Sequence, residues 1–259
     1  MLYVFTIAGL AAGICVGVLG FADAVLANAV FALFLGSLGT ETLFAIVCGG
    51  VITYSANLFL MRRRRDWICW RQRSTLFSLV VFALPAVFLA TIYLKPVVST
   101  HLRIVNASLG GLLLAVCGYN LVAKPVTLTE HTARRTTAAI GLLSGILGAV
   151  AGLSGVITTL WVKAREEWSQ PEARGVYQPF VSVMHLTVLV LLLVGSPMRT
   201  PSLNVIAYVV FSAIGLACSM TIVATERMNP KDLEEYLPKL VNVAGVLAAL
   251  NLLHHALRN

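Results

Sequence analysis

Long apolar stretches alternate with short polar connections along the whole chain. Eight of them come close to the roughly 20 residues that an α-helix needs to cross the hydrocarbon core of a bilayer. They run over 3–20, 41–61, 75–94, 104–123, 136–162, 176–195, 202–224 and 238–253, and a further apolar stretch, 24–38, follows the first closely. This pattern predicts an all-α polytopic membrane protein with about eight transmembrane helices.

Glycine-rich breaks interrupt two of these stretches, about half a chain apart. Residues 13–20 and 145–152 are identical at four of eight positions when they are aligned at a shift of 132. A helix that is broken at membrane depth needs protein or a polar cavity to satisfy its freed backbone groups. Paired breaks in corresponding positions therefore indicate a transporter binding site, with the first helix of each half broken or re-entrant.

Other landmarks recur in the same order, which extends the similarity between the halves. Pro96 corresponds to Pro230 and Gly111 to Gly245, both at a shift of 134. We therefore expect two four-helix repeats, 1–123 and 136–259, joined by a cytoplasmic linker over 124–135 into one membrane domain. An even number of crossings in each repeat would make the halves parallel, whereas re-entrant hairpins at the breaks would make them inverted. The sequence leaves both arrangements open.

Composition and charge support a membrane protein. The chain is 58% hydrophobic and only 12% charged, against about 25% charged residues in soluble domains. Much of its net charge of +8 comes from arginines in 62–73 and basic residues in 124–135. In a bacterial inner membrane, the positive-inside rule places these loops on the cytoplasmic side. Counting eight crossings outward from them places both termini on the same side. Topology and contact with anionic membrane lipids explain the arginines, so we expect no nucleic-acid binding. The sequence is compatible with a monomer or a homodimer.

The two breaks supply the first candidate site residues. Asp23 either caps the half-helix that follows it or carries a proton. In the second break Ser154 and Gly155 take the corresponding place, where Ser154 can act as the cap. Free N–H groups and the positive dipole end at a half-helix N-terminus suit an anion. We therefore expect Asn28 and Thr158, within two turns of those ends, to bind substrate, although Thr158 can instead bond back to its own helix.

A polar stripe marks the helix after each break. Gln178, Ser182 and His185 share one helical face, as do Tyr54 and Asn57 in the first half. Lipid would leave such a stripe unsatisfied, so it either lines a cavity or bonds to a neighbouring helix. His185 could donate to an anion or relay a proton near neutral pH.

Motifs for other chemistries are missing from the sequence. We find no nucleotide-binding loop, no nucleophile with a base, and no cysteine or histidine spacing typical of a metal site. The chain is therefore predicted not to be an enzyme, with no catalytic residues, no metal and no cofactor.

The chain resembles the TauE/SafE family of sulfite-exporter-like permeases over nearly its whole length. The resemblance rests on the two glycine-rich breaks, the basic loop from Arg62 to Arg73, the Gln170–Arg174 segment and the prolines near 85, 96 and 230. It implies a secondary transporter for small organic or sulfur-containing anions such as sulfite, sulfonates or short carboxylates, linked to the proton gradient. It also implies that substrate binds where the halves meet.

A non-transporting accessory protein is the alternative function. Relatives typically have a run of glycines and a proline in the first break, whereas this chain has Gly20-Phe21-Ala22-Asp23. A relative that lost the chemistry of the break could keep the fold and bind a partner protein instead.

Overall fold

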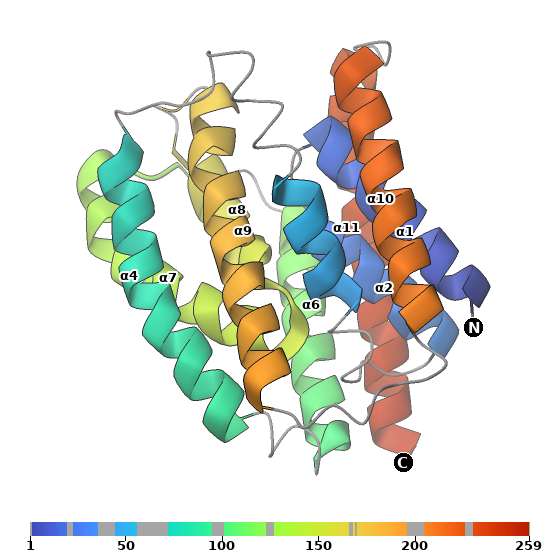
Figure 1. The fold of residues 1–259 in the computed structure, drawn as a ribbon. Coiled ribbons are helices and arrows are strands. Elements are labelled where there is room, and N and C mark those ends of the chain that lie inside the picture. The colour runs from blue at the N-terminus through green and yellow to red at the C-terminus, as the bar shows by residue number, and fades with distance from the viewer. Residues whose placement is uncertain are drawn as a thin grey trace.

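The computed structural model describes residues 2–19, 23–35, 45–55, 72–94, 101–122, 127–165, 168, 170–195, 205–225 and 230–258. Within these ranges the chain is helical apart from short caps and connections, which confirms the all-α prediction (Figure 1). The helices are α1 (Leu2–Leu19), α2 (Asp23–Leu35), α4 (Arg73–Leu89) with a π-helical turn (Ala90–Leu94), α6 (Leu102–Val122), α7 (Glu130–Ala151), α8 (Ser154–Lys163), α9 (Gln170–Gly195), α10 (Val205–Thr225) and α11 (Pro230–Arg258). The helix Ala45–Ser55 carries no label in Figure 1.

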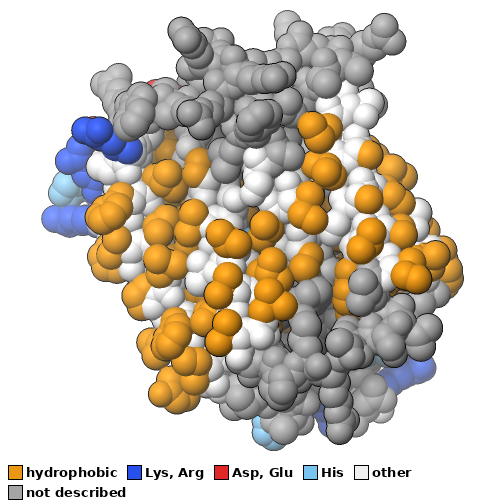
Figure 2. Space-filling model, viewed as in Figure 1, with side chains coloured by type: hydrophobic (Ala, Val, Ile, Leu, Met, Phe, Trp, Pro, Cys, Tyr) orange, Lys and Arg blue, Asp and Glu red, His pale blue; other side chains and the backbone are white. Residues whose placement is uncertain are grey.

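The described flank of the molecule carries many exposed apolar side chains, as lipid contact requires. Hydrophobic side chains cover the visible flank of the molecule, and Lys and Arg side chains gather towards its ends (Figure 2). Three helices are long and apolar enough to cross a membrane, at Arg73–Tyr93, Gly175–Val194 and Lys239–Arg258, and five shorter apolar helices accompany them in the described part of the chain. Many large apolar side chains are exposed; Phe77, for example, is 70% exposed. The protein is therefore a multi-pass membrane protein.

The helices on either side of each glycine-rich break lie side by side and antiparallel. In the first half, Tyr3 packs against Phe34 and Phe5 against Phe31, so α1 and α2 lie antiparallel. In the second half, the backbone N–H of Leu128 donates to the carbonyl of Ala164 at 2.7 Å. The beginning of α7 and the end of α8 therefore lie side by side. Helices α1 and α2, and helices α7 and α8, therefore form two antiparallel helical hairpins.

Gly152 makes the second turn possible. Its φ of 68° lies in the left-handed region, where a side chain is disfavoured and glycine is not. The N–H groups of Gly152 and Leu153 bond back to the carbonyls of Gly148 and Leu147, which closes the C-terminal end of α7. Ser154, expected as the cap of α8, is instead its first residue, because Leu153 holds the cap position and has no group that can cap.

Helix α7 begins earlier than its apolar stretch. Thr129 caps it by accepting from the N–H of Thr132, and Glu130 occupies the first turn, where a carboxylate favours the helix dipole. Residues 130–135, which we expected in the linker, are therefore helical.

The halves are packed through small residues on each other's helices. Gly9 and Gly13 of α1 face the backbone of Phe211 and Gly215 in α10. In the same way, α7 faces α4, with Gly141 against Leu79 and Gly145 against Ala83. The two contacts are equivalent at a shift of 132: Gly9 and Gly13 correspond to Gly141 and Gly145, and Leu79 and Ala83 correspond to Phe211 and Gly215. The close approach that glycine permits thus recurs in both halves.

Helices α6 and α11 run antiparallel. Gly110 of α6 lies against Ala249 of α11, and further along α6 the amide of Asn120 donates to that of Asn242 at 3.5 Å. The order of the contacts along α11 is reversed relative to α6. The last helices of the two halves therefore point in opposite directions.

Two buried cores result, and the helix Ala45–Ser55 belongs to both. One core joins α1, α2, α6, α10 and α11, and it includes Ala45 and Ile46. The other joins α4, α7, α8 and α9, and it includes Val47 and Tyr54. Figure 1 shows α4, α7, α8 and α9 on the left, α1, α2, α10 and α11 on the right, and α6 near the middle. The candidate site lies between the two cores.

Candidate functional site at the tip of the second hairpin

The tip of the α7–α8 hairpin crosses from one core to the other. The bodies of α7 and α8 pack against α4 and α9. Ala151 and Leu153, on either side of the turn, are instead buried in the core of α1, α2, α6, α10 and α11. The turn therefore meets side chains from both halves of the chain.

Two buried side chains satisfy carbonyls that the break frees. Asn28 of α2 donates its amide N–H to the carbonyl of Ala151 at 3.0 Å. His185 of α9 places Nε2 3.3 Å from the carbonyl of Gly152. Carbonyls at a helix end have no partner within the helix, and hydrocarbon offers none. Both predicted site residues are thus brought to the tip, where they hold its backbone.

A pair of tyrosines joins the halves beside this tip. The hydroxyls of Tyr54 and Tyr177 lie 3.3 Å apart, and both side chains are buried. The ring of Tyr54 also meets that of His185 edge to face, at 6.0 Å between centroids. Gly155, in the first turn of α8, leaves room for the hydroxyl of Tyr177. Tyr177 was not among the predicted residues, since a tyrosine on an apolar helix is equally typical of a core.

The hydroxyls of α8 differ in how they are satisfied. Thr158 lies 2.7 Å from the hydroxyl of Ser144 in α7 and 3.3 Å from the carbonyl of Ser154. The hydroxyls of Ser154 and Thr159 are buried, and neither has a hydrogen-bond partner among the described residues. Buried polar groups usually have one. The first two turns of α8 therefore carry two buried hydroxyls that have no hydrogen-bond partner among the described residues.

The remaining predicted residues are less close to the tip or cannot be placed. Gln178 is buried on α9, and Ser182 lies 3.5 Å from Ser55 in the helix Ala45–Ser55, hydroxyl to hydroxyl. Asp23 is the first residue of α2. Its side chain, like the whole of Asn57, lies outside the described residues.

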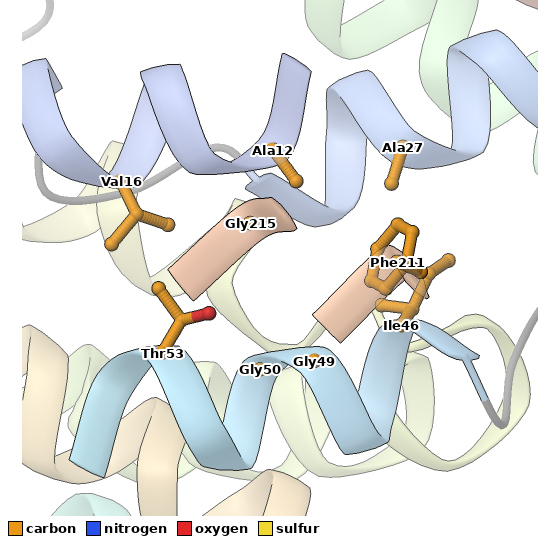
Figure 3. A pocket seen from close by; sticks show the side chains of 9 residues that line it. All are labelled: Ala12, Val16, Ala27, Ile46, Gly49, Gly50, Thr53, Phe211 and Gly215. Carbon is orange, nitrogen blue, oxygen red and sulfur yellow. The ribbon is translucent and has the colours of Figure 1, made fainter. Parts of the chain in front are cut away.

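A small cavity lies beside the first hairpin (Figure 3). It has a volume of about 10 Å³, which is the size of a single water site. It is lined by Ala12, Val16, Ala27, Ile46, Gly49, Gly50, Thr53, Phe211 and Gly215. Thr53 alone among them brings a hydroxyl, so this cavity suits no anion in the conformation described.

The family model described as sulfite exporter TauE/SafE matches residues 5–252. No curated protein and no solved structure matches the chain.

Proposed function

We propose that this chain, which belongs to the sulfite exporter TauE/SafE family, carries small organic or sulfur-containing oxyanions past the tip of the α7–α8 hairpin. Membership in the family confirms the resemblance found in the sequence and implies a membrane transporter of sulfur anions. The finer proposal concerns the substrate range, which includes sulfite, sulfonates and short carboxylates, and the residues that bind it.

The observation that carries this proposal is the pair of buried hydroxyls without partners on α8. Ser154 begins the helix, and Thr159 follows five residues later, in the next turn. A helix N-terminus offers N–H groups and a positive dipole end, and hydroxyls add further donors to an oxyanion. Tyr54 and Tyr177 would contribute their hydroxyls once the ligand separated them. Asn28 and His185 keep the turn in place.

Two repeats of opposite orientation explain how such a site could face either side of the membrane. The contacts that recur at a shift of 132 and the antiparallel pair α6 and α11 support this relation. Each repeat would consist of one re-entrant hairpin and three crossings, in place of four crossings. Rocking of one half against the other is the usual consequence of inverted repeats.

Removal of the two hydroxyls tests the site. We expect Ser154→Ala with Thr159→Val to lower flux of the transported anion into proteoliposomes by about tenfold or more, because a hydrogen bond to a charged group contributes about 1.5–3 kcal/mol. The assay would use sulfite, thiosulfate, sulfoacetate, taurine and lactate. Thr187→Val is the matched control, since that hydroxyl bonds within its own helix to the carbonyl of Val183.

Two results would speak against the proposal. Flux of the double variant equal to that of the control would remove the site from α8. Lack of flux for every anion with the unmodified protein would favour the accessory function.

Proton linkage is proposed for Asp23 and His185, which the sequence singles out as titrating groups inside apolar segments. A charged Asp23 beside an anion path repels the substrate, so we expect flux to rise as pH falls. Asp23→Asn should flatten this pH profile and raise flux at neutral pH, whereas Asp23→Glu should retain the dependence. An unchanged profile for Asp23→Asn would remove Asp23 from the coupling.

A further inference from the structure

Four buried aromatic side chains fill the space between the first hairpin and α10. We call them the aromatic cluster: Phe5 of α1, Phe31 of α2, and Tyr208 and Phe211 of α10. The ring of Phe5 lies 5.0 Å from that of Phe31 and 6.0 Å from that of Tyr208, between centroids. The ring of Phe31 lies 6.0 Å from that of Phe211. Rings in such contact leave no opening beside the base of this hairpin.

The equivalent positions of the second half carry no aromatic residue. At the shift of 132, the aromatic cluster corresponds to Thr137, Lys163, Leu76 and Leu79. A polar cleft with a volume of about 720 Å³ opens beside these positions, and Thr137 itself lines it. Thr75 and Ser78 of α4, which are neighbours of the two leucines in the chain, line it as well. The second half is therefore open where rings close the first.

The directions of the helices show at which end of the molecule the cleft lies. Helices α4, α7 and α9 all begin at the cleft. The helix Ala45–Ser55 runs antiparallel to α9. Its Gly50 faces His185, whereas Tyr54, one turn further on, contacts Tyr177, which is two turns earlier on α9. The helix Ala45–Ser55 therefore runs towards the end with the cleft.

The aromatic cluster lies at the opposite end. Helix α10 runs parallel to the helix Ala45–Ser55, because Phe211 faces Gly49 and Gly215 faces Thr53. Helix α1 has the same direction as α10, as their glycine contacts show. Both helices therefore begin away from the cleft, and the aromatic cluster occupies their first halves. The open and the closed space are on opposite sides of the membrane.

Phe211 separates the rest of the aromatic cluster from the small cavity beside the first hairpin. In Figure 3 its ring lies between Ala27 of α2 and Ile46, at one end of this cavity. Gly49 makes room for the ring, since a Cβ at that position would overlap it. Gly50 also lines the cavity, and it lies against His185, which holds the tip of the second hairpin. The cavity is therefore placed between the cluster and that tip.

The two ends of the molecule differ in what they can admit. Buried aromatic rings exclude a hydrated anion, because the anion would lose its water without gaining a polar partner. A polar cleft of the volume given above holds water and small solutes. Repeats that rock against each other are expected to be open on one side of the membrane while they are closed on the other.

We propose that the aromatic cluster is the closed gate on the path of the anion, with Phe211 as its innermost residue, and that the polar cleft is the open entrance. The structure is then the conformer that is open at the end where α4, α7 and α9 begin. In the opposite conformer the rings separate and admit water to the cavity behind Phe211. This inference rests on the proposed transport function.

The test is the reaction of single cysteines with sulfonatoethyl methanethiosulfonate, a charged thiol reagent, in the full-length protein in nanodiscs. Ser78→Cys, in the cleft, should react rapidly. Thr53→Cys, in the cavity, should react slowly, because a volume of about 10 Å³ is too small for the reagent until the rings separate. Phe211→Leu introduces the residue type of the second half and removes a ring contact. It should speed the reaction of Thr53→Cys by about two- to tenfold.

Two controls separate opening of the gate from general loosening of the protein. Phe77→Leu is the same change at a side chain that is 70% exposed on α4, and it should leave the rate unchanged. Native Cys117, kept as the single cysteine, is buried against Gly245 of α11 and should stay unreactive with Phe211→Leu. If Phe211→Leu folds poorly, Phe31→Leu removes the middle ring of the cluster and should have the same effect on Thr53→Cys.

Three results would overturn the gate. They are a reaction of Thr53→Cys as rapid as that of Ser78→Cys while the cluster is intact, an unchanged rate with Phe211→Leu and Phe31→Leu, and a parallel rise for Cys117. Because the labelling needs no flux, the two proposals fail separately. Anion flux that depends on Ser154 and Thr159, without any response of the labelling to Phe211→Leu, would retain the proposed function and remove the gate.

Discussion

A disulfide between positions 55 and 182 is expected to stop transport. The hydroxyls of Ser55 and Ser182 lie 3.5 Å apart, on the helix Ala45–Ser55 of the first half and on α9 of the second. A disulfide requires two side chains that point at each other at short range, and the contact between these hydroxyls shows that Ser55 and Ser182 do so. If the halves rock against each other during transport, this bond would hold them in one position.

The measurement is anion flux into proteoliposomes with Ser55→Cys and Ser182→Cys together. Flux should fall to the background of empty liposomes after oxidation and return after reduction. The five native cysteines have to be replaced first, because they would form other bonds; they are Cys15, Cys48, Cys69, Cys117 and Cys218. Each single variant is a control. Full flux with the disulfide confirmed by mass spectrometry would show that these helices do not separate during transport.

Local signals in the sequence were enough to locate the breaks and the stripe that contains His185. Glycine at three or four positions of one apolar helix marks both turns. The helical spacing of polar residues also predicts the two faces that meet, one containing Tyr54 and the other His185. The rings of these residues pack against each other as two stripes on facing helices would.

The fold-back of the hairpins could not be read from the sequence. An apolar stretch after a break has the same composition whether the helix continues across the membrane or returns. The bond between Leu128 and Ala164 decides between these, and it joins residues that are far apart in the chain. Asn28 likewise finds its acceptor at Ala151, in the other half.

Gly50→Ala is expected to destabilise the protein more than the same substitution at the other described glycines, because an added Cβ there would come closest to a neighbouring atom. A Cβ at this position would overlap Nδ1 of His185, whose ring lies directly against the glycine. Overpacking of this kind costs about 1–3 kcal/mol. If His185 moves to avoid it, the carbonyl of Gly152 loses its partner, and an unsatisfied buried acceptor costs about 1–3 kcal/mol more. Both the midpoint of thermal unfolding in detergent and anion flux should therefore fall.

Gly111→Ala is the matched control for this prediction. Gly111 lies within α6, and an added Cβ there would meet nothing within 4 Å. Alanine favours a helix over glycine by about 1 kcal/mol, so this variant should unfold at the same temperature as the unmodified protein or higher. Equal stability of Gly50→Ala and Gly111→Ala would contradict the contact between Gly50 and His185.

A double variant separates the packing of His185 from its chemistry. His185→Ala makes room for the new methyl group, so Gly50→Ala with His185→Ala should be more stable than the sum of the single effects predicts, by about 0.5–3 kcal/mol. Flux gives the second readout. If His185 only fills space, flux should recover together with stability. We expect flux to stay low, because the ring that holds the carbonyl of Gly152, and that we propose as a proton carrier, is still missing.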